Sequence, residues 1–415
     1  MNHPPRRRKL VPMTEDSSTP TSSGRINRAQ FLQRAAALGL LTTVGSALPA
    51  AATRGPASGT SAAGPAVQAT GAAQGSVLRG LGFKGVAYDT GTGFIGDDSR
   101  VLWRTSIMRG EIKAIRERLH ANWVSIYGSD VKRMTDTATE ALRQGLKVSI
   151  QPRSFDEPQE AALEKLRQTA VLAERLRRRH GPEVILVVGC ECMLFTPGIV
   201  PGANFFERVE YLIKGEFDMR ELQRKLLAYT AKAVSVARGN FRGRITYGAA
   251  SDLEQIDWSL FDIVGLDYYS YHEDRTDHSK ELAPFRRWGK PILILEFGCC
   301  TFTGAPELGG MGWEIVDYEV DPPQIKDGYV RDERAQADHL RTMLEVFEAE
   351  GFLGASPYTF ISPDAPHRPE RKYDEDIAAF SLCKVIRRRS DDPASPYRWE
   401  PKESFAAVSG FYSRK

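Results

Sequence analysis

The stretch VILVVGCE, residues 184–191, decides the fold of this chain, because a short apolar run ends there in a single carboxylate. A second run of the same kind, PILILE, occupies residues 291–296. Uninterrupted runs of branched apolar residues are typical of parallel strands that are buried on both faces. We therefore expect two such strands, which present Glu191 and Glu296 at their carboxyl ends.

Strand-like runs alternate with helix-like segments on both sides of these stretches. Eight candidate strands are Phe83–Asp89, Asn122–Tyr127, Lys147–Pro152, Val184–Glu191, Arg244–Ala249, Ile263–Tyr269, Pro291–Phe297 and Phe352–Phe360. The helix-like segments are Ser106–His120, Val131–Gln144, Pro158–His180, Phe217–Arg238, Asp332–Glu350 and Ile377–Arg387. This alternation over residues 78–388 predicts a single α/β domain, a (β/α)8 TIM barrel. A doubly wound open sheet is the alternative, but no glycine-rich phosphate turn follows the first strand.

Composition and charge describe an ordinary globular protein of 415 residues, with 41% hydrophobic and 26% charged side chains. The formal net charge of +3 is uneven, because residues 1–52 hold seven basic side chains and only two acidic ones. The remainder of the chain is therefore slightly acidic, which argues against nucleic acid as a partner. Residues 389–415 lack a clear period, and we expect them to form a C-terminal extension on the surface.

The first 52 residues have the order of an export signal. Basic and polar residues precede a mildly apolar run at 35–45, and Ala50-Ala51-Ala52 follows as a small-residue cleavage pattern. The segment NRAQFL, residues 27–32, resembles a twin-arginine motif with Ala29 in place of the second arginine. The apolar run is too short for a membrane span, and residues 53–77 are expected to form a disordered linker. We predict a secreted or cell-envelope protein, with a disordered basic tail as the alternative.

Two carboxylates at the same end of a barrel suggest a reaction. In a (β/α)8 barrel the carboxyl ends of the strands carry the catalytic groups. A facing pair of carboxyl groups is the minimum equipment for cleaving a glycosidic bond. Burial and a nearby negative charge from Glu296 would keep a proton on Glu191 at neutral pH. The alternative is that each glutamate only pairs with an arginine or lysine at a strand end.

These residues resemble a known family. Glutamates that close the fourth and seventh strands are similar to those of clan A glycoside hydrolases, which are retaining enzymes on a TIM barrel. The segments KGVAYDTG (84–91), VVGCE (187–191) and EFGCCT (296–301) also resemble actinobacterial proteins labelled abortive phage infection proteins. The resemblance implies that Glu191 is the general acid/base, that Glu296 is the nucleophile and that a carbohydrate is the substrate, with no cofactor. One departure is Cys190, which stands where the clan usually has a sugar-binding asparagine.

Further polar and aromatic groups are expected around the mouth of the barrel as substrate-binding residues. They are Asp89, Arg153, Tyr268, Tyr269, His272 and Trp313. Aromatic faces stack on sugars, and arginine or aspartate side chains bind hydroxyl groups. One of the two adjacent tyrosines is expected to face the outer helices instead, and Arg153 has the alternative role of neutralising a glutamate.

Four of the five cysteines flank the two glutamates: Cys190, Cys192, Cys299 and Cys300. Their spacings do not match the usual zinc patterns, so we expect no metal site, and buried thiols or a disulfide between strand ends are the other interpretations. A barrel that binds a glycan without cutting it is the main functional alternative, since Cys190 is a weak hydrogen-bond donor. A thiol-dependent metal or redox enzyme is a third.

Overall fold

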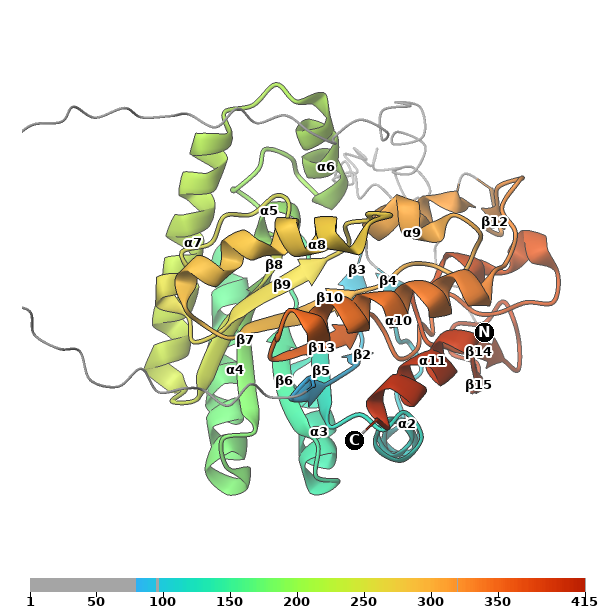
Figure 1. The fold of residues 1–415 in the computed structure, drawn as a ribbon, viewed down its shortest axis with the longest axis horizontal. Coiled ribbons are helices and arrows are strands. Elements are labelled where there is room, and N and C mark those ends of the chain that lie inside the picture. Colours follow the sequence, from blue (N-terminus) through green and yellow to red (C-terminus); the bar gives the residue numbers. More distant parts are fainter. Residues whose placement is uncertain (1–79, 95–96, 319, 415) are drawn as a thin grey trace, which may run out of the picture.

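The computed structural model describes residues 80–94, 97–318 and 320–414. The predicted export signal (1–52) and linker (53–77) lie outside the described residues. The centre of the fold is a parallel sheet with the strand order β1-β13-β10-β9-β8-β7-β6-β5-β2, seen in Figure 1. Its strands are β1 (Phe83–Lys84), β2 (Ala87–Asp89), β5 (Trp123–Gly128), β6 (Lys147–Pro152), β7 (Val184–Cys190), β8 (Arg244–Ala250), β9 (Val264–Tyr268), β10 (Ile292–Phe297) and β13 (Gly354–Pro357).

The sheet closes into a barrel through its first strand. Only Gly85 and Val86 separate β1 from β2, so the two form one interrupted strand. Its first half pairs with β13 and its second half with β5. A Cβ atom at Gly85 would lie 2.2 Å from the Trp123 ring, which explains why the interruption needs a glycine. The eight strand positions confirm the predicted (β/α)8 fold.

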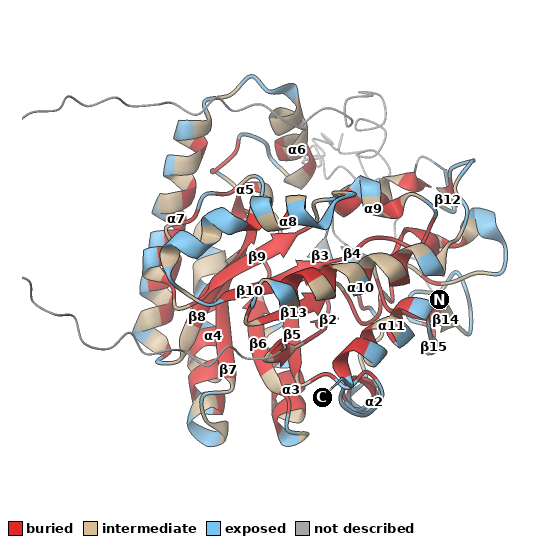
Figure 2. Ribbon diagram, in the orientation of Figure 1, coloured by how far each residue is buried: buried red, intermediate tan, exposed pale blue. Residues whose placement is uncertain are grey.

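Helices surround the barrel and turn one face toward it, as the buried and exposed sides in Figure 2 show. The longer ones are α2 (Thr105–Glu117), α3 (Val131–Arg143), α4 (Gln159–His180), α6 (Phe205–Lys214), α7 (Met219–Asn240), α8 (Arg275–Leu282), α10 (Glu333–Ala349) and α11 (Glu403–Tyr412). Shorter elements in the loops are α5 (Cys192–Phe195), α9 (Ala305–Leu308), β3 (Gly93–Phe94), β4 (Asp97–Asp98), β11 (Val316–Asp317) and β12 (Gln324–Ile325). None of the helices in the described part of the chain is both long and apolar enough to cross a membrane.

The end of the chain differs from the prediction. The expected helix Ile377–Arg387 is wrong, because residues 383–387 form strand β14 (Cys383–Arg387), which pairs with β15 (Tyr397–Pro401). Cys383 and Val385 are buried while Lys384 and Ile386 are less so, and this alternation is that of a strand.

The residues expected to form a C-terminal extension, 389–415, contain β15 and α11. Helix α11 packs against α10 and ends beside α2 (Figure 1). The Ser409 hydroxyl donates to the Arg118 carbonyl at 2.8 Å, and Lys84 Nζ donates to the Tyr412 carbonyl at 2.8 Å. Helix α11 therefore occupies the place of the eighth barrel helix.

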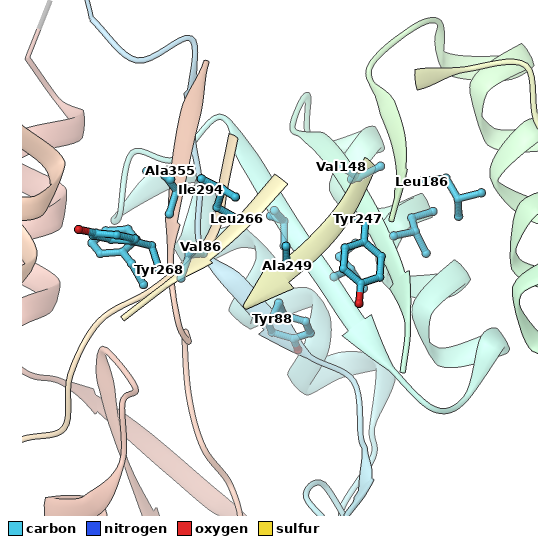
Figure 3. Close-up of a cluster of buried hydrophobic side chains, with 14 of the residues drawn as sticks. Val86, Tyr88, Val148, Leu186, Tyr247, Ala249, Leu266, Tyr268, Ile294 and Ala355 are labelled. Atoms are coloured by element: carbon cyan, nitrogen blue, oxygen red, sulfur yellow. The ribbon is translucent and has the colours of Figure 1, made fainter. Parts of the chain in front are cut away.

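Alternation along the strands divides the core into two layers. Side chains that point outward pack against the helices, among them Val148, Leu186, Leu266 and Ile294 (Figure 3). The intervening residues point into the barrel, where the apolar ones form a separate buried cluster: Phe83, Trp123, Ile185, Val187, Ile263, Leu293 and Leu295. Because this cluster fills the interior toward the amino ends of the strands, polar inward-facing residues gather at the carboxyl ends.

A valine pair tests whether α11 is part of the barrel. Val408 on α11 is fully buried, whereas Val330 is 60% exposed. We expect Val408→Ala to lower the free energy of unfolding by about 2 kcal/mol, because it removes buried methyl groups and leaves a cavity. The control Val330→Ala should change it by less than about 0.5 kcal/mol. Urea unfolding measures both, and equal stabilities would contradict the assignment of α11.

Candidate active site

Glu191 follows β7 directly and has a left-handed backbone, with φ 43° and ψ 48°. Its N–H donates to the Gly248 carbonyl on β8 at 2.9 Å. A non-glycine residue in this region costs roughly 1 kcal/mol or more and is typical of functional sites. The turn separates Glu191 from the regular alternation of β7 and lets α5 begin at the next residue.

The surroundings of Glu191 favour its protonated form. Burial raises the pKa of the Glu191 carboxyl well above its ordinary value, and the negative charges of Asp267 and Glu254 act in the same direction. The positive charge of Arg153 opposes them. The sequence predicts that the negative charge of Glu296 raises the pKa of Glu191. In the structure, the principal acidic neighbours of Glu191 are instead Asp267 and Glu254.

Glu296 lies near the end of β10 and has two partners of the kind that a carboxylate binds. Its Oε1 forms an ion pair with Arg153, and the Tyr269 hydroxyl donates to its Oε2 at 3.1 Å. Its side chain is 9% exposed. An ion pair with a guanidinium and a hydrogen bond from a hydroxyl suit an ionised carboxyl group, so the two glutamates occupy electrostatically different places.

Arg153 is held on several sides. It follows β6, and its Nε donates to the Gln151 side chain at 3.0 Å. Its guanidinium carbon lies 4.0 Å from the centre of the Tyr127 ring and 5.7 Å from that of Tyr358. The two rings stack on each other at 5.5 Å between centroids. Cation–π contacts of this kind are strongest where water is excluded, and they fix the guanidinium next to Glu296.

Asp267, a buried carboxyl group on β9 between the two glutamates, was not predicted from the sequence. The Cys190 thiol donates to Asp267 Oδ2 at 3.3 Å. Burial raises the pKa of Asp267 to about 7, although Arg153 and the Cys190 thiol both favour its charged form. A Cβ atom at Gly248 would lie 2.7 Å from Asp267 Oδ2, so the glycine leaves the room that this carboxyl group occupies. The available signal was the alternation of β9, because the residue between two outward-facing ones must point inward.

Glu254 is a second acidic residue that was missed. It is buried, and its carboxyl group accepts from the backbone of Met193 at 2.8 Å and from the Tyr247 hydroxyl at 3.0 Å. Burial raises its pKa to about 8. Since Met193 lies in α5, Glu254 anchors the short helix that follows Glu191.

Alternation also separates the two tyrosines. Tyr269 faces Glu296, as described above. The Tyr268 hydroxyl instead donates to Glu281 at 2.7 Å and lies 2.7 Å from His278 Nδ1, both on α8. His272 joins this second group, with its Nε2 2.8 Å from Glu281. The structure therefore brings together Glu191, Glu296, Arg153 and Tyr269, and it places Tyr268 and His272 in a different cluster.

The two remaining predicted residues are Asp89, the last residue of β2, and Trp313, in the loop after β10. Asp89 is buried and accepts from the Gly91 N–H at 2.8 Å and the Ser99 hydroxyl at 2.5 Å, so it organises the loop after β2. Trp313 is partly buried against the apolar cluster that contains Cys299 and Cys300.

The loop after β10 covers Tyr269 through two glycines. A Cβ atom at Gly309, which has φ 50°, would lie 2.5 Å from the Tyr269 carbonyl oxygen. One at Gly310 would lie 3.6 Å from the Tyr269 ring. The approach at Gly309 requires glycine, whereas the contact at Gly310 is an ordinary van der Waals distance. The loop therefore packs on the side of Tyr269 and keeps the tyrosine against Glu296.

The cysteines form no disulfide; all five are free and buried. The ligand atoms of Cys190, Asp267 and Glu296 lie within 4.8 Å of one another, which is a spacing that could hold a metal ion. The positive charge beside this group is, however, already that of Arg153, which pairs with Glu296. We interpret the three as a hydrogen-bonded network around the guanidinium.

Comparison with solved structures gives glycoside hydrolases. A family 113 β-1,4-mannanase has a TM-score of 0.51 at 14% identity, and the match covers 80% of this chain and 100% of the mannanase. The β-glycosidase BGL167 has a TM-score of 0.47 at 11% identity (80% and 96% covered), and PbGH5A, a family 5 glycoside hydrolase from Prevotella bryantii B14, has 0.46 at 11% (81% and 96%). No protein-family model matches the sequence, and no curated protein matches it.

The fold is a (β/α)8 barrel similar to that of the mannanase. The mannanase match carries this conclusion, and at such low identity it concerns the fold alone. The resemblance to abortive phage infection proteins stays a prediction.

The raised pKa of Asp267 predicts a pH dependence of stability. An unfolded aspartate titrates near ~4, so this carboxyl group contributes stability at low pH that is lost as the pH rises toward about 7. Asp267→Asn removes the titration. We therefore expect the variant to gain at least about 1 kcal/mol relative to the wild type between pH 4.5 and pH 8. Denaturant unfolding at several pH values measures this difference. Asp327→Asn, at a fully exposed side chain, should run parallel to the wild type, and a parallel curve for Asp267→Asn would contradict the prediction.

Proposed function

We propose that this protein is a retaining glycoside hydrolase that works by double displacement through Glu191 and Glu296. The observation that carries the proposal is the contrast between the two carboxyl groups. Glu296 is paired with Arg153 and Tyr269 as a carboxylate, whereas burial and acidic neighbours favour a proton on Glu191. One group equipped to attack and one equipped to donate a proton are what a retaining mechanism requires.

In the first step, Glu296 attacks the anomeric carbon of the bound sugar. The bond from that carbon to the leaving oxygen breaks, and Glu191 donates its proton to this oxygen. The product is a glycosyl ester of Glu296 and a released alcohol. The ion pair with Arg153 and the hydrogen bond from Tyr269 weaken as Glu296 loses its negative charge to form the ester. Both interactions are restored when the ester is cleaved.

In the second step, Glu191 acts as a base. It removes a proton from a water molecule, whose oxygen attacks the anomeric carbon and releases Glu296 as a carboxylate. Two inversions restore the original configuration. A separation of about 5 to 5.5 Å between the two carboxyl groups is expected for this mechanism, since no water has to fit between the nucleophile and the sugar.

Substitution of the two glutamates tests the assignment on a panel of nitrophenyl and dinitrophenyl glycosides. Glu296→Ala should lower kcat by about a thousandfold or more on every substrate, because the nucleophile has no substitute. Glu191→Ala should spare the first step for dinitrophenyl glycosides, whose leaving group needs no proton. Glu117→Gln, at an exposed position of α2, is the matched control and should leave kcat unchanged.

The stereochemistry of the first product gives an independent test. NMR of the freshly released sugar should show the retained anomer. An inverted anomer, or full activity of Glu296→Ala, would contradict the mechanism.

A non-catalytic glycan-binding barrel is the second candidate, and Cys190 is the observation that favours it. A cysteine has no side-chain amide to offer a sugar hydroxyl, and the Cys190 thiol already donates to Asp267 within the protein. Glycan binding by calorimetry, without hydrolysis of any glycoside in the panel, would select this candidate. Binding that survives Glu296→Ala, together with turnover that does not, selects the hydrolase.

We also propose that the protein is exported and acts outside the cytoplasmic membrane. The support is the order of basic, apolar and small residues in 1–52 and the linker composition of 53–77. Amino-terminal sequencing of protein from the culture medium or cell envelope should give a start near Thr53. Protein that keeps Met1 and remains in the cytoplasm would contradict export.

A further inference from the structure

A second polar cluster lies on the other side of β9, between the loop after that strand and α8. It consists of His272, His278 and Glu281, and we call it the α8 cluster. The ligand atoms of these three side chains lie within 4.8 Å of one another. His278 and Glu281 are three residues apart on one helix, which places them on the same face, and His272 reaches them from the preceding loop.

The contacts in the α8 cluster converge on one carboxylate. His272 Nε2 lies 2.8 Å from Glu281 Oε2, and the Tyr268 hydroxyl donates to the same oxygen at 2.7 Å. The Ser270 hydroxyl donates to the other oxygen, Oε1, at 2.8 Å. The Tyr268 hydroxyl also lies 2.7 Å from His278 Nδ1. The protein thus holds the two imidazoles and the carboxylate together through hydrogen bonds.

The α8 cluster differs from comparable groups in its charge. Among the described residues, two other sets have ligand-like spacing, and each contains a fixed cation: Arg153 pairs with Glu296 in one, and Arg331 with Asp374 in the other. The described partners of Glu281 are a histidine, a tyrosine and a serine. Its negative charge is therefore matched by no arginine or lysine among them, and a bound cation would supply the missing charge.

Access to the α8 cluster is open on one side. His278 is only 2% exposed, whereas the side chains of His272 and Glu281 are 35% and 31% exposed. A buried ligand beside two partly exposed ones leaves room for an ion to enter and for a water molecule to complete its coordination. Imidazole and carboxylate together suit zinc and related divalent ions, which take four ligands at about 2.0–2.2 Å.

We propose that His272, His278 and Glu281 bind one zinc-class divalent cation, with one coordination position open to solvent. The Tyr268 and Ser270 hydroxyls orient the Glu281 carboxylate from behind. The ion ties the loop after β9 to α8 and so stabilises that side of the barrel. This proposal does not depend on the glycosidase mechanism, because none of the three ligands contacts Glu296 in the described structure.

Titration of the full-length protein with zinc tests the proposal. Protein stripped with EDTA should bind one Zn²⁺ per chain by calorimetry, and a saturating excess should raise its Tm by mass action. Co²⁺ in place of Zn²⁺ should give visible absorption bands of a four-coordinate site. Both His272→Ala and Glu281→Gln should weaken zinc binding at least about tenfold.

A matched control separates this site from the other histidine–carboxylate group. His367 contacts Asp374 at 2.9 Å but shares that group with Arg331, so His367→Ala should bind zinc as the wild type does. Melting curves without metal show whether each variant is folded. If Glu281→Gln does not fold, His272→Ala alone tests the proposal, because His272 is partly exposed and its substitution is tolerated more easily. Absence of zinc binding, equal affinity in the His272 variant, or loss of binding in the His367 variant would overturn the proposal.

Discussion

The ion pair between Arg153 and Glu296 is the contact on which the mouth of this barrel depends. The guanidinium lies over Tyr127, donates a hydrogen bond to the Gln151 side chain and reaches Glu296 on the opposite side of the barrel. One cation among several buried acidic groups decides which of them carries charge. Without it, the interior would hold unpaired carboxylates, whose burial costs several kcal/mol.

The two glutamates differ because their neighbours differ. Glu296 has a cation and a hydroxyl as partners, while Glu191 is surrounded by the carboxyl groups of Asp267 and Glu254. Environments that push the properties of two similar groups apart are the usual way in which a protein assigns acid and nucleophile roles. The left-handed backbone of Glu191 also contributes to this difference, because it moves the carboxyl group out of the regular strand.

Strand β9 connects the site to a second polar cluster through adjacent residues. Tyr269 points into the barrel toward Glu296, and Tyr268 points outward to His278 and Glu281. Because the wall of the barrel is a single sheet, consecutive side chains serve two different environments. The α8 cluster therefore lies close to the candidate site in the chain and yet has a separate set of ligands and a separate access to solvent.

The sequence by itself determined the eight strands, most helices and the two strand-end glutamates, because long apolar runs and their period depend only on local residue order. It did not determine β14, where a short segment suits either period, or the place of α11, which depends on contacts with α2 and α10. Only the tertiary structure decided that Arg153 pairs with Glu296, that Asp267 and Glu254 flank Glu191, and that Tyr269 rather than Tyr268 faces the site. These outcomes depend on closure of the barrel, which brings residues from β6, β7, β9 and β10 to one end, and no local pattern records distances across that interior.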